Sequence, residues 1–217
     1  MMDTPAHWRD AQQALSECCP VMHGLIKLAG PVVLQTRGDP YQTLARSIVG
    51  QQISVKAAAS VWSRFEERCK NKVEPLKVSR MRISSLRECG LSERKAEYLK
   101  DLSIKFVDGS LDPDDWLELD DEAVIASLVK VRGIGRWTAE MFLIFNQLRP
   151  DVWPLDDIGL LRALGIHWSE NPQIAWKDRS VKASRAQAKE LGERFRPWRS
   201  VATWYLWRSL DPLPVSY

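Results

Sequence analysis

The chain has 217 residues, of which 45% are hydrophobic and 27% charged, and a formal net charge of +3 at pH 7. This composition is typical of a globular protein with a substantial core, and a charge of this size does not by itself indicate a nucleic-acid partner. We find no signal peptide and no apolar run of membrane-spanning length, so we expect no membrane partner and a cytoplasmic location. The four cysteines lack metal-ligand spacing, which predicts reduced and mostly packed thiols.

Charged residues are unevenly distributed along the chain. Residues 108–122 contain eight acidic residues and no basic residue, whereas residues 177–208 contain nine basic and three acidic residues. Either stretch can be an ordinary solvated face. Alternatively, the molecule has an acidic side and a basic side, and the basic side could meet phosphate groups.

The apolar residues follow a helical period along almost the whole chain. Tyr41, Leu44, Ala45, Ile48 and Val49, for example, share one helix face. Helices are predicted, in chain order, near residues 6–17, 21–29, 41–49, 54–68, 79–88, 92–107, 122–129, 136–146, 156–164, 183–195 and 198–209.

Prolines are expected to separate these helices. Pro20, Pro40, Pro75 and Pro172 are among those that fall between the helical runs. No strand, internal repeat or flexible linker is apparent in the sequence. It therefore predicts an all-α protein of about ten helices, a fold that identifies no function by itself.

The most informative segment, residues 128–139, reads Leu-Val-Lys-Val-Arg-Gly-Ile-Gly-Arg-Trp-Thr-Ala. One helix is expected to end before it and another to begin near Arg136, so that Gly133 and Gly135 lie in a tight turn that needs their conformational freedom. The first N–H groups of the second helix lack acceptors within the helix and attract an anion. With Arg132 and Arg136 beside them, they could hold one DNA phosphate without reading the base sequence. A Gly-x-Gly turn alone can also be a plain connection between helices.

Further segments give this turn a context. The sequence Gly-Ile-Gly-Arg-Trp-Thr-Ala, followed about twenty residues later by the aspartates of Val-Trp-Pro-Leu-Asp-Asp-Ile (152–158), resembles the helix-hairpin-helix (HhH-GPD) DNA glycosylase superfamily. Residues 48–58, Ile-Val-Gly-Gln-Gln-Ile-Ser-Val-Lys-Ala-Ala, are similar to the element that this family inserts into the DNA stack. Residues 196–208 are similar to the last helix of its bacterial 3-methyladenine DNA glycosylase II branch, and the resemblance covers roughly residues 5–210.

The resemblance implies two helical lobes with a cleft between them, and a monomer that acts on double-stranded DNA containing damaged bases. Residues 1–37 are expected to form helices that pack with the C-terminal lobe, residues 38–150 to form the lobe with the hairpin, and residues 151–217 to form the catalytic loop and the C-terminal helices. The N-terminal β-rich domain of the bacterial branch has no counterpart here, so we expect a compact version of that enzyme.

By its position in the family motif, Asp157 corresponds to the catalytic acid. Breaking an N-glycosidic bond builds positive charge on the deoxyribose, which a nearby carboxylate stabilises while it orients the attacking water. An alkylated purine such as 3-methyladenine already carries positive charge and leaves readily, so a second carboxylate is not required. Either Asp156 or Asp157 could instead cap the helix predicted to follow, and we assign a capping or structural role to Asp156 and the catalytic role to Asp157.

The residue after the hairpin decides the type of reaction. Family members that also cleave the DNA strand carry a lysine there, which forms a Schiff base with the sugar. This position is Trp137, and Lys130 lies before the glycines, so the resemblance implies hydrolysis only, with an abasic site as product. No cysteine follows Cys89, so the iron–sulfur cluster of some relatives is not expected.

The base pocket is expected to be aromatic, because stacking holds a flipped base and an electron-rich ring face attracts a cationic one. Trp137 and Trp207 match aromatic pocket positions of the 3-methyladenine branch, although either could be a core residue instead. Met141 and Ile158 occupy positions where that branch has tyrosines, which leaves a less aromatic pocket and an open substrate range.

Gln51 and Gln52 are candidates for filling the gap that a flipped base leaves in the DNA stack. Gln52 matches the intercalating position of the family, although both glutamines could be plain loop residues. Ser54 is expected to cap the helix that follows.

The family also implies a metal site built from main-chain atoms. Hairpin carbonyls in these proteins bind a monovalent or divalent cation beside the phosphate, and the matching carbonyls are those of Val129, Val131 and Ile134. The reaction itself requires no cofactor. The three histidines are scattered along the sequence and are assigned no role.

Three other functions stay open. A non-enzymatic DNA-binding module could use the hairpin for phosphate contact alone, but it would need neither an acid at position 157 nor an aromatic pocket. A glycosylase of the same fold could act on deaminated, oxidised or mispaired bases, because Trp137 argues against strand cleavage without identifying the base. A helical interaction scaffold unrelated to DNA would not explain why the hairpin, the aspartate loop and the glutamine loop occur together.

Overall fold

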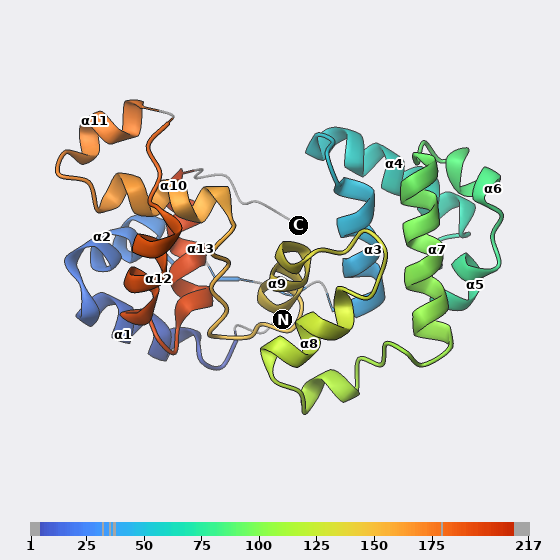
Figure 1. Cartoon of the computed structure of the whole chain (residues 1–217), viewed down its shortest axis with the longest axis horizontal. Helices are drawn as coiled ribbons and strands as arrows, with labels where there is room; N and C mark the ends of the chain where they lie inside the picture. The colour runs from blue at the N-terminus through green and yellow to red at the C-terminus, as the bar shows by residue number, and fades with distance from the viewer. Residues whose placement is uncertain (1–4, 32, 35, 37, 179, 211–217) are drawn as a thin grey trace. The chain divides into compact units, whose positions relative to one another are not determined.

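The computed structural model describes residues 5–31, 33–34, 36, 38–178 and 180–210 (Figure 1). Thirteen α-helices and one short 3-10 helix, η1, occupy this part of the chain, and no strand occurs in it. The prediction of an all-α protein is therefore confirmed, with more helices than expected. In chain order the elements are α1 (Trp8–Cys18), α2 (Pro20–Ala29), α3 (Pro40–Gly50), α4 (Val55–Arg68), α5 (Pro75–Ser79), α6 (Ile83–Arg87), α7 (Glu93–Val107), η1 (Asp115–Leu117), α8 (Asp121–Leu128), α9 (Arg136–Phe145), α10 (Ile158–His167), α11 (Pro172–Lys177), α12 (Arg185–Glu193) and α13 (Arg199–Leu210).

The chain divides into two compact units, and one division falls inside α9. The first unit combines the described residues up to Thr36 with those from Leu143 to Leu210, and it contains α1, α2 and α10–α13. The second unit is the continuous stretch that ends at Phe142, and it contains α3–α8 and most of α9. The first unit therefore combines helices that precede the second unit in sequence with helices that follow it.

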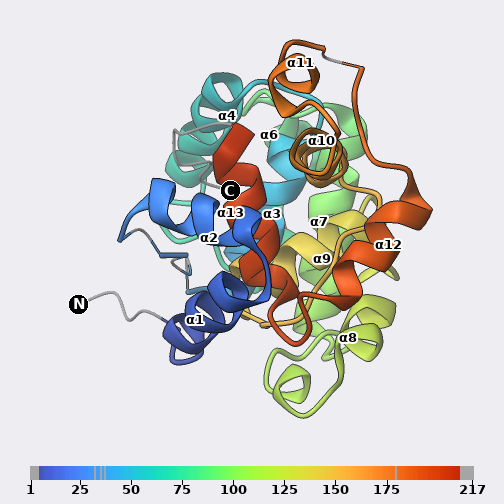
Figure 2. The ribbon, with the colours of Figure 1, turned by 90° about the vertical axis from the view of Figure 1, so that its left-hand side faces the viewer.

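Helix α13 lies at the centre of the first unit, where it packs against α1, α2 and α10 (Figure 2). Its residues 200–206 are all buried, so this stretch has no solvent-exposed face. The ring of Trp8 on α1 packs edge-on against Trp204, with 5.3 Å between the ring centroids. Gln12 Nε2 donates a hydrogen bond of 2.7 Å to the Tyr205 hydroxyl. These contacts join the N-terminal helices to the last helix of the chain.

Helix α7 has the corresponding place in the second unit, where it packs against α3, α5 and α6 (Figure 1). A row of aromatic rings in edge-to-face contact continues this core, with centroid distances of 5.3 Å for Tyr41–Phe106, 6.0 Å for Phe106–Trp116 and 5.2 Å for Trp116–Phe142. The buried Tyr41 hydroxyl lies 2.8 Å from Ser103 Oγ, so it has the partner that a buried polar group needs. The row holds η1 and α9 against α3 and α7.

Serine side chains fix the start of two long helices, and the prediction that Ser54 caps one of them is confirmed. Ser54 accepts a hydrogen bond of 3.2 Å from the N–H of Ala57, and Ser92 accepts one of 3.3 Å from the N–H of Lys95. Each bond satisfies one N–H that has no acceptor within the helix.

The prediction that prolines separate the helices is wrong for four of them. Pro20, Pro40, Pro75 and Pro172 do not lie between helices, because each is the first residue of one. The fixed φ of proline suits that position, and the N–H that proline lacks would have had no acceptor there. Reading these prolines only as breakers is why α5 and α11 are absent from the prediction.

The single helix predicted at residues 79–88 is wrong. Helix α5 ends at Ser79 and α6 begins only at Ile83. Arg82 lies between them in an extended conformation with ψ of 147°, which interrupts the helix.

All four cysteines are free thiols, with Cys18 exposed and the other three buried. Burial raises the pKa of the Cys69 thiol to about 11, so it is protonated at neutral pH and a poor nucleophile. The prediction of reduced and mostly packed cysteines is confirmed.

Candidate functional site

The hairpin predicted from the two glycines is present in the second unit. Helix α8 ends at Leu128, α9 begins at Arg136, and the turn between them contains Gly133 with φ of +85°. A side chain is excluded at Gly133, because a Cβ there would lie 2.1 Å from the ring of Tyr98 on α7. A Cβ at Gly135 would meet no atom within 4 Å. Only the first glycine is therefore required by both backbone conformation and packing.

The loop between α3 and α4 contacts the hairpin through Gln51, whose Nε2 donates a hydrogen bond of 2.8 Å to the Gly133 carbonyl. Gln52 is exposed and has a φ of +57°, a left-handed conformation that side-chain-bearing residues rarely adopt. The structure thus gives different surroundings to the two glutamines, which are both candidates for insertion into the DNA stack. Gln51 connects the loop to the hairpin, and Gln52 projects from the loop.

The two hairpin arginines are paired with carboxylates. Arg136 Nε donates to Glu140 at 3.0 Å, and both terminal nitrogens of Arg136 bind the carboxylate of Glu122. Arg132 Nη2 lies 2.9 Å from Glu97. The hydrogen bond from Arg136 lowers the pKa of Glu122, so this pair is fully charged at neutral pH. An anion at the hairpin must therefore use the main-chain N–H groups of α9 or compete with these carboxylates.

Three carbonyls of the turn were predicted to bind a cation, those of Val129, Val131 and Ile134. The Val131 carbonyl accepts the N–H of Ile134 at 3.1 Å, and a carbonyl oxygen has two lone pairs. Neutral carbonyl oxygens fit a hard monovalent or divalent cation. The described residues include no cluster of three or more His, Cys, Asp or Glu side chains that could hold a metal, so such a cation would depend on main-chain oxygens.

Asp157 is the N-cap of α10 in the first unit. Its Oδ1 accepts a hydrogen bond of 2.6 Å from the N–H of Leu160, and the residue is only 8% exposed. Asp156 does not cap this helix, so the capping part of the role predicted for it is wrong. Asp156 is exposed and forms an ion pair with Arg185 instead. Capping fixes the orientation of the Asp157 carboxylate at the positive end of the helix dipole.

The indole of Trp207 contacts the same carboxylate oxygen. Its Nε1 donates to Asp157 Oδ1 at 2.7 Å, and its ring stacks on Phe145 with 5.7 Å between centroids and 10° between planes. Gly159 lies against both partners, since a Cβ there would be 3.1 Å from Asp157 Oδ1 and 3.1 Å from Trp207 Cδ1. Asp157 therefore lies beside an aromatic wall formed by Trp207 and Phe145.

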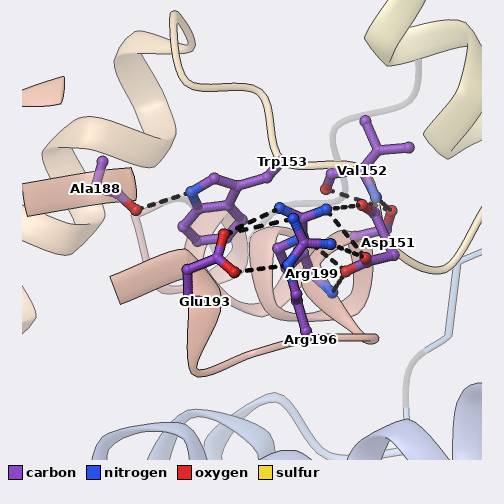
Figure 3. Close-up of polar contacts among 8 residues, drawn as sticks. Asp151, Val152, Trp153, Ala188, Glu193, Arg196 and Arg199 are labelled. Atoms are coloured by element: carbon purple, nitrogen blue, oxygen red, sulfur yellow. Dashed lines mark hydrogen bonds and ion pairs between the residues drawn. The ribbon is translucent and has the colours of Figure 1, made fainter. Parts of the chain in front are cut away.

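An ion-pair network fixes the chain just before this aspartate loop (Figure 3). Asp151 accepts hydrogen bonds of 2.7 and 3.0 Å from Arg199 and one of 2.9 Å from Arg196. Ser200 Oγ accepts a hydrogen bond of 2.9 Å from the N–H of Val152. The network connects the start of α13 to the approach to Asp157. It also shows that basic residues of the stretch 177–208 are partly neutralised within the molecule.

The other predicted pocket residues are divided between the units. Trp137 and Met141 belong to the second unit, whereas Ile158 follows Asp157 in the first. Trp137 is 40% exposed and Ile158 is 75% exposed, so each presents apolar surface that a ligand could cover. Met141 is 5% exposed and is a buried side chain in the structure.

Sequence reasoning missed the residues that hold the hairpin and the aspartate in place. Asp101 Oδ2 accepts the main-chain N–H of Arg132 at 2.8 Å, and Tyr98 packs against Gly133. Their spacing of three residues places both on one face of α7, but the sequence does not indicate what covers that face. Gly159 had a usable signal, because a glycine in the first turn of a helix costs stability and therefore suggests a close neighbour.

Comparisons with known proteins identify the family to which the chain belongs. The chain matches the HhH-GPD superfamily of base excision DNA repair proteins over residues 45–192, and it belongs to that superfamily. It is 33% identical to DNA-3-methyladenine glycosylase 1 of Schizosaccharomyces pombe, over 85% of this chain and 80% of that protein. It is also 32% identical to the DNA-3-methyladenine glycosylase of Saccharomyces cerevisiae, over 81% of this chain and 68% of that protein.

Solved structures of proteins named 3-methyladenine glycosylase or glycosidase are also similar to this chain. The DNA-3-methyladenine glycosidase of Bacillus halodurans aligns with a TM-score of 0.81 and 30% identity, over 93% of this chain and 89% of that one. The Schizosaccharomyces pombe 3-methyladenine DNA glycosylase in complex with abasic DNA aligns with a TM-score of 0.79 and 28% identity, over 96% and 99% of the two chains. The family predicted from the hairpin, the aspartate loop and the glutamine loop is confirmed. Within the described residues, no helix has the length and apolar character needed to cross a bilayer.

Proposed function

We propose that the protein is a monofunctional DNA glycosylase of base excision repair. It removes alkylated bases of the 3-methyladenine and 7-methylguanine type from double-stranded DNA and leaves an abasic site. The observation that carries the proposal is the nearly buried Asp157 carboxylate, held at the start of α10 and bound by Trp207. The names of its relatives support the alkylated-base class of substrate. We also propose that the protein is a monomer that acts in the cytoplasm, on the nucleoid if the source is bacterial.

The chemistry follows from the position of one carboxylate. The C1′–N bond of a flipped nucleotide breaks, its electron pair leaves with the base, and positive charge builds on the sugar. Asp157 stabilises that charge, and because its Oδ1 is already bound, the carboxylate needs little reorganisation when the charge appears. Water adds to C1′ and loses a proton that the carboxylate can accept. A methylated purine is a cation that departs neutral, so it needs no general acid.

The base pocket in this proposal contains the residues around the carboxylate. Trp207 and Ile158 lie next to Asp157 in the first unit and would contact the flipped base. Trp137 and Met141 keep the pocket roles that the family resemblance gives them. Stacking on tryptophan favours a cationic base by about 1–2 kcal/mol in a desolvated pocket.

DNA binding is assigned to the hairpin and the glutamine loop. The N–H groups at the start of α9, with Gly133, Gly135, Arg132 and Arg136 around them, would hold a phosphate, with or without a cation on the turn carbonyls. Gln52 would fill the gap in the DNA stack, which its exposure supports. Gln51, bound to the Gly133 carbonyl, would keep the loop at a fixed position relative to the hairpin.

The decisive experiment compares wild type, Asp157→Asn and Asp156→Asn on methylated duplex DNA. We expect wild type to release 3-methyladenine or 7-methylguanine and to leave alkali-labile sites without nicks, since no lysine follows the hairpin. Asp157→Asn should reduce the single-turnover rate at least about 100-fold while affinity for abasic-site DNA stays within about threefold. Asp156→Asn is the matched control, because it removes an adjacent but exposed carboxylate, and it should retain the wild-type rate.

Each contrary outcome identifies what fails. A fully active Asp157→Asn variant would overturn the catalytic assignment. A wild-type protein that releases nothing from methylated DNA would overturn the alkylated-base assignment, and deaminated or mispaired bases would then be tested. Binding without release of any base would favour the non-enzymatic module.

A further inference from the structure

Two donors from different helices meet at Asp157 Oδ1. The N–H of Leu160 donates at 2.6 Å from α10 itself, and Trp207 Nε1 donates at 2.7 Å from α13, 50 residues away in sequence. The bond from Leu160 is an ordinary helix cap. The bond from Trp207 has no role in capping. It adds a second, charge-assisted contact that fixes which way the carboxylate points.

The Trp207 indole is held in place by its neighbours. Phe145 stacks on one side of the indole with an interplanar angle of 10°. Gly159 packs so closely that a Cβ would approach Trp207 Nε1 to 3.2 Å. The network around Asp151 anchors the first turn of the helix that carries Trp207 (Figure 3). The indole therefore has little freedom to rotate away from the carboxylate.

We infer that Trp207 is a positioning residue, which holds the Asp157 carboxylate in its reactive orientation through the indole N–H. The inference rests on the proposed function and goes beyond it, because a tryptophan that only lines a base pocket needs its ring and not its N–H. A small misplacement of a catalytic group costs up to about 100-fold in rate. Losing the N–H should therefore slow base release, even when the ring is retained.

An isosteric replacement separates the two roles. In 3-benzothienylalanine a sulfur takes the place of the indole N–H, so the ring remains while the donor is lost. With this residue at position 207, we expect the single-turnover release of 7-methylguanine to fall about 10- to 100-fold. Affinity for abasic-site DNA should stay within about twofold, and the rate ratio between 7-methylguanine and 3-methyladenine should not change. Trp207→Phe should change the rate in the same direction.

Trp153 offers a matched control in the same unit. Its Nε1 donates to the Ala188 carbonyl at 2.9 Å, so the same replacement removes a buried indole hydrogen bond of similar length (Figure 3). This bond does not involve Asp157. The replacement at Trp153 should lower the melting temperature but leave the rate of base release within about twofold.

A spectroscopic signature tests the contact without any substrate. With 15N-labelled tryptophan, the indole signal that disappears in Trp207→Phe belongs to Trp207. In wild type this N–H should be shifted downfield and exchange slowly with solvent, as expected for a bond to a carboxylate. Asp157→Asn should move the signal upfield, because a neutral amide oxygen is a weaker acceptor, and Asp156→Asn should not.

The outcomes distinguish the inference from the function on which it rests. Slow base release by the benzothienyl variant, with unchanged DNA affinity and base preference, supports positioning. A variant as fast as an active wild type, or one whose base preference changes, overturns the inference and leaves Trp207 as a pocket wall. A wild type that releases no base overturns the proposed function, and the indole signal then still reports whether Trp207 binds Asp157.

Discussion

At the residue scale, position 133 imposes two constraints that only a glycine can meet. Its φ is +85°, and a Cβ would lie 2.1 Å from the Tyr98 ring. Gly133→Ala should therefore lower the free energy of unfolding by about 2–4 kcal/mol, the sum of a strained backbone and a crowded contact. The loss is measurable by urea denaturation followed by circular dichroism.

Gly135→Ala is the control for that measurement. It is the neighbouring glycine of the same turn, and a Cβ there would meet nothing within 4 Å. We expect this variant to lose less than about 1 kcal/mol of the free energy of unfolding, because only the capping preference of the residue before α9 changes. Equal losses in the two variants would contradict the argument from the Tyr98 contact.

Asp156 and Asp157 show how far single residues could be predicted. The family motif singled out Asp157, but local sequence could not decide which aspartate caps α10, because either one precedes an apolar helix. The answer depends on backbone conformation, with Asp157 at φ −78° and ψ 117° and its side chain turned onto Leu160. The partner Trp207 lies 50 residues away, and no local pattern predicts that contact.

At the scale of elements, the pairing of Arg136 with Glu122 links α9 to the start of α8 and competes with DNA phosphate. Glu122→Gln removes the competing charge and leaves the guanidinium freer to bind phosphate. We expect tighter binding to abasic-site duplex DNA at low salt. The slope of log Kd against the logarithm of the salt concentration should be steeper by about one unit. Fluorescence anisotropy at several salt concentrations measures both quantities.

Two comparisons check this prediction. Glu118→Gln removes the same charge from the same acidic stretch, but Glu118 does not contact Arg136, so its salt slope should stay near that of wild type. Acidification gives the second comparison. The pKa of Glu122 is lowered by Arg136, so the pair persists at neutral pH and is lost only as the pH falls through that lowered value. The affinity difference between wild type and Glu122→Gln should shrink there, and a constant difference would contradict competition.

The Asp151 network is the second element-scale contact with a measurable contribution. The Asp151 carboxylate accepts three hydrogen bonds from guanidinium groups, and its partner Arg199 is only 15% exposed in its side chain. Asp151→Asn should lower the free energy of unfolding by about 1–3 kcal/mol, because it leaves a partly buried guanidinium without its anion. Chemical denaturation measures the loss. Glu193→Gln, whose exposed side chain also contacts Arg199 at 3.9 Å, should cost less than about 1 kcal/mol, and a larger effect there would contradict this ranking.

Helices were easier to predict than their ends. Periodicity located the long helices such as α4 and α7, because their buried faces repeat every three to four residues. Short helices such as α5 and α11 have too few turns to show a period, and each begins at a proline that looks like a breaker. The hairpin was predictable because its glycines and its family sequence lie within one short segment. The carboxylates that bind its arginines were not, because Glu97 lies 35 residues before Arg132.

At the scale of the whole molecule, the two units differ in how the chain builds them. The second is continuous, whereas the first needs helices from both ends of the sequence. The periodic pattern of α1 and α2 shows that each has an apolar face but does not indicate that α13 covers it. Only the resemblance to the glycosylase superfamily indicated that the N-terminal helices pack with the C-terminal ones.

This difference predicts different behaviour of fragments. A fragment of residues 37–146 contains the aromatic row around Trp116 and a complete α9, and it should fold alone with a cooperative thermal transition. A fragment of residues 143–217 should not, because it lacks the α1 partners of Trp204 and Tyr205 and would expose α13 to water. Adding a peptide of residues 5–36 should restore its helicity and near-ultraviolet circular dichroism. Cooperative melting of residues 143–217 without the peptide would show that the C-terminal helices form their own core.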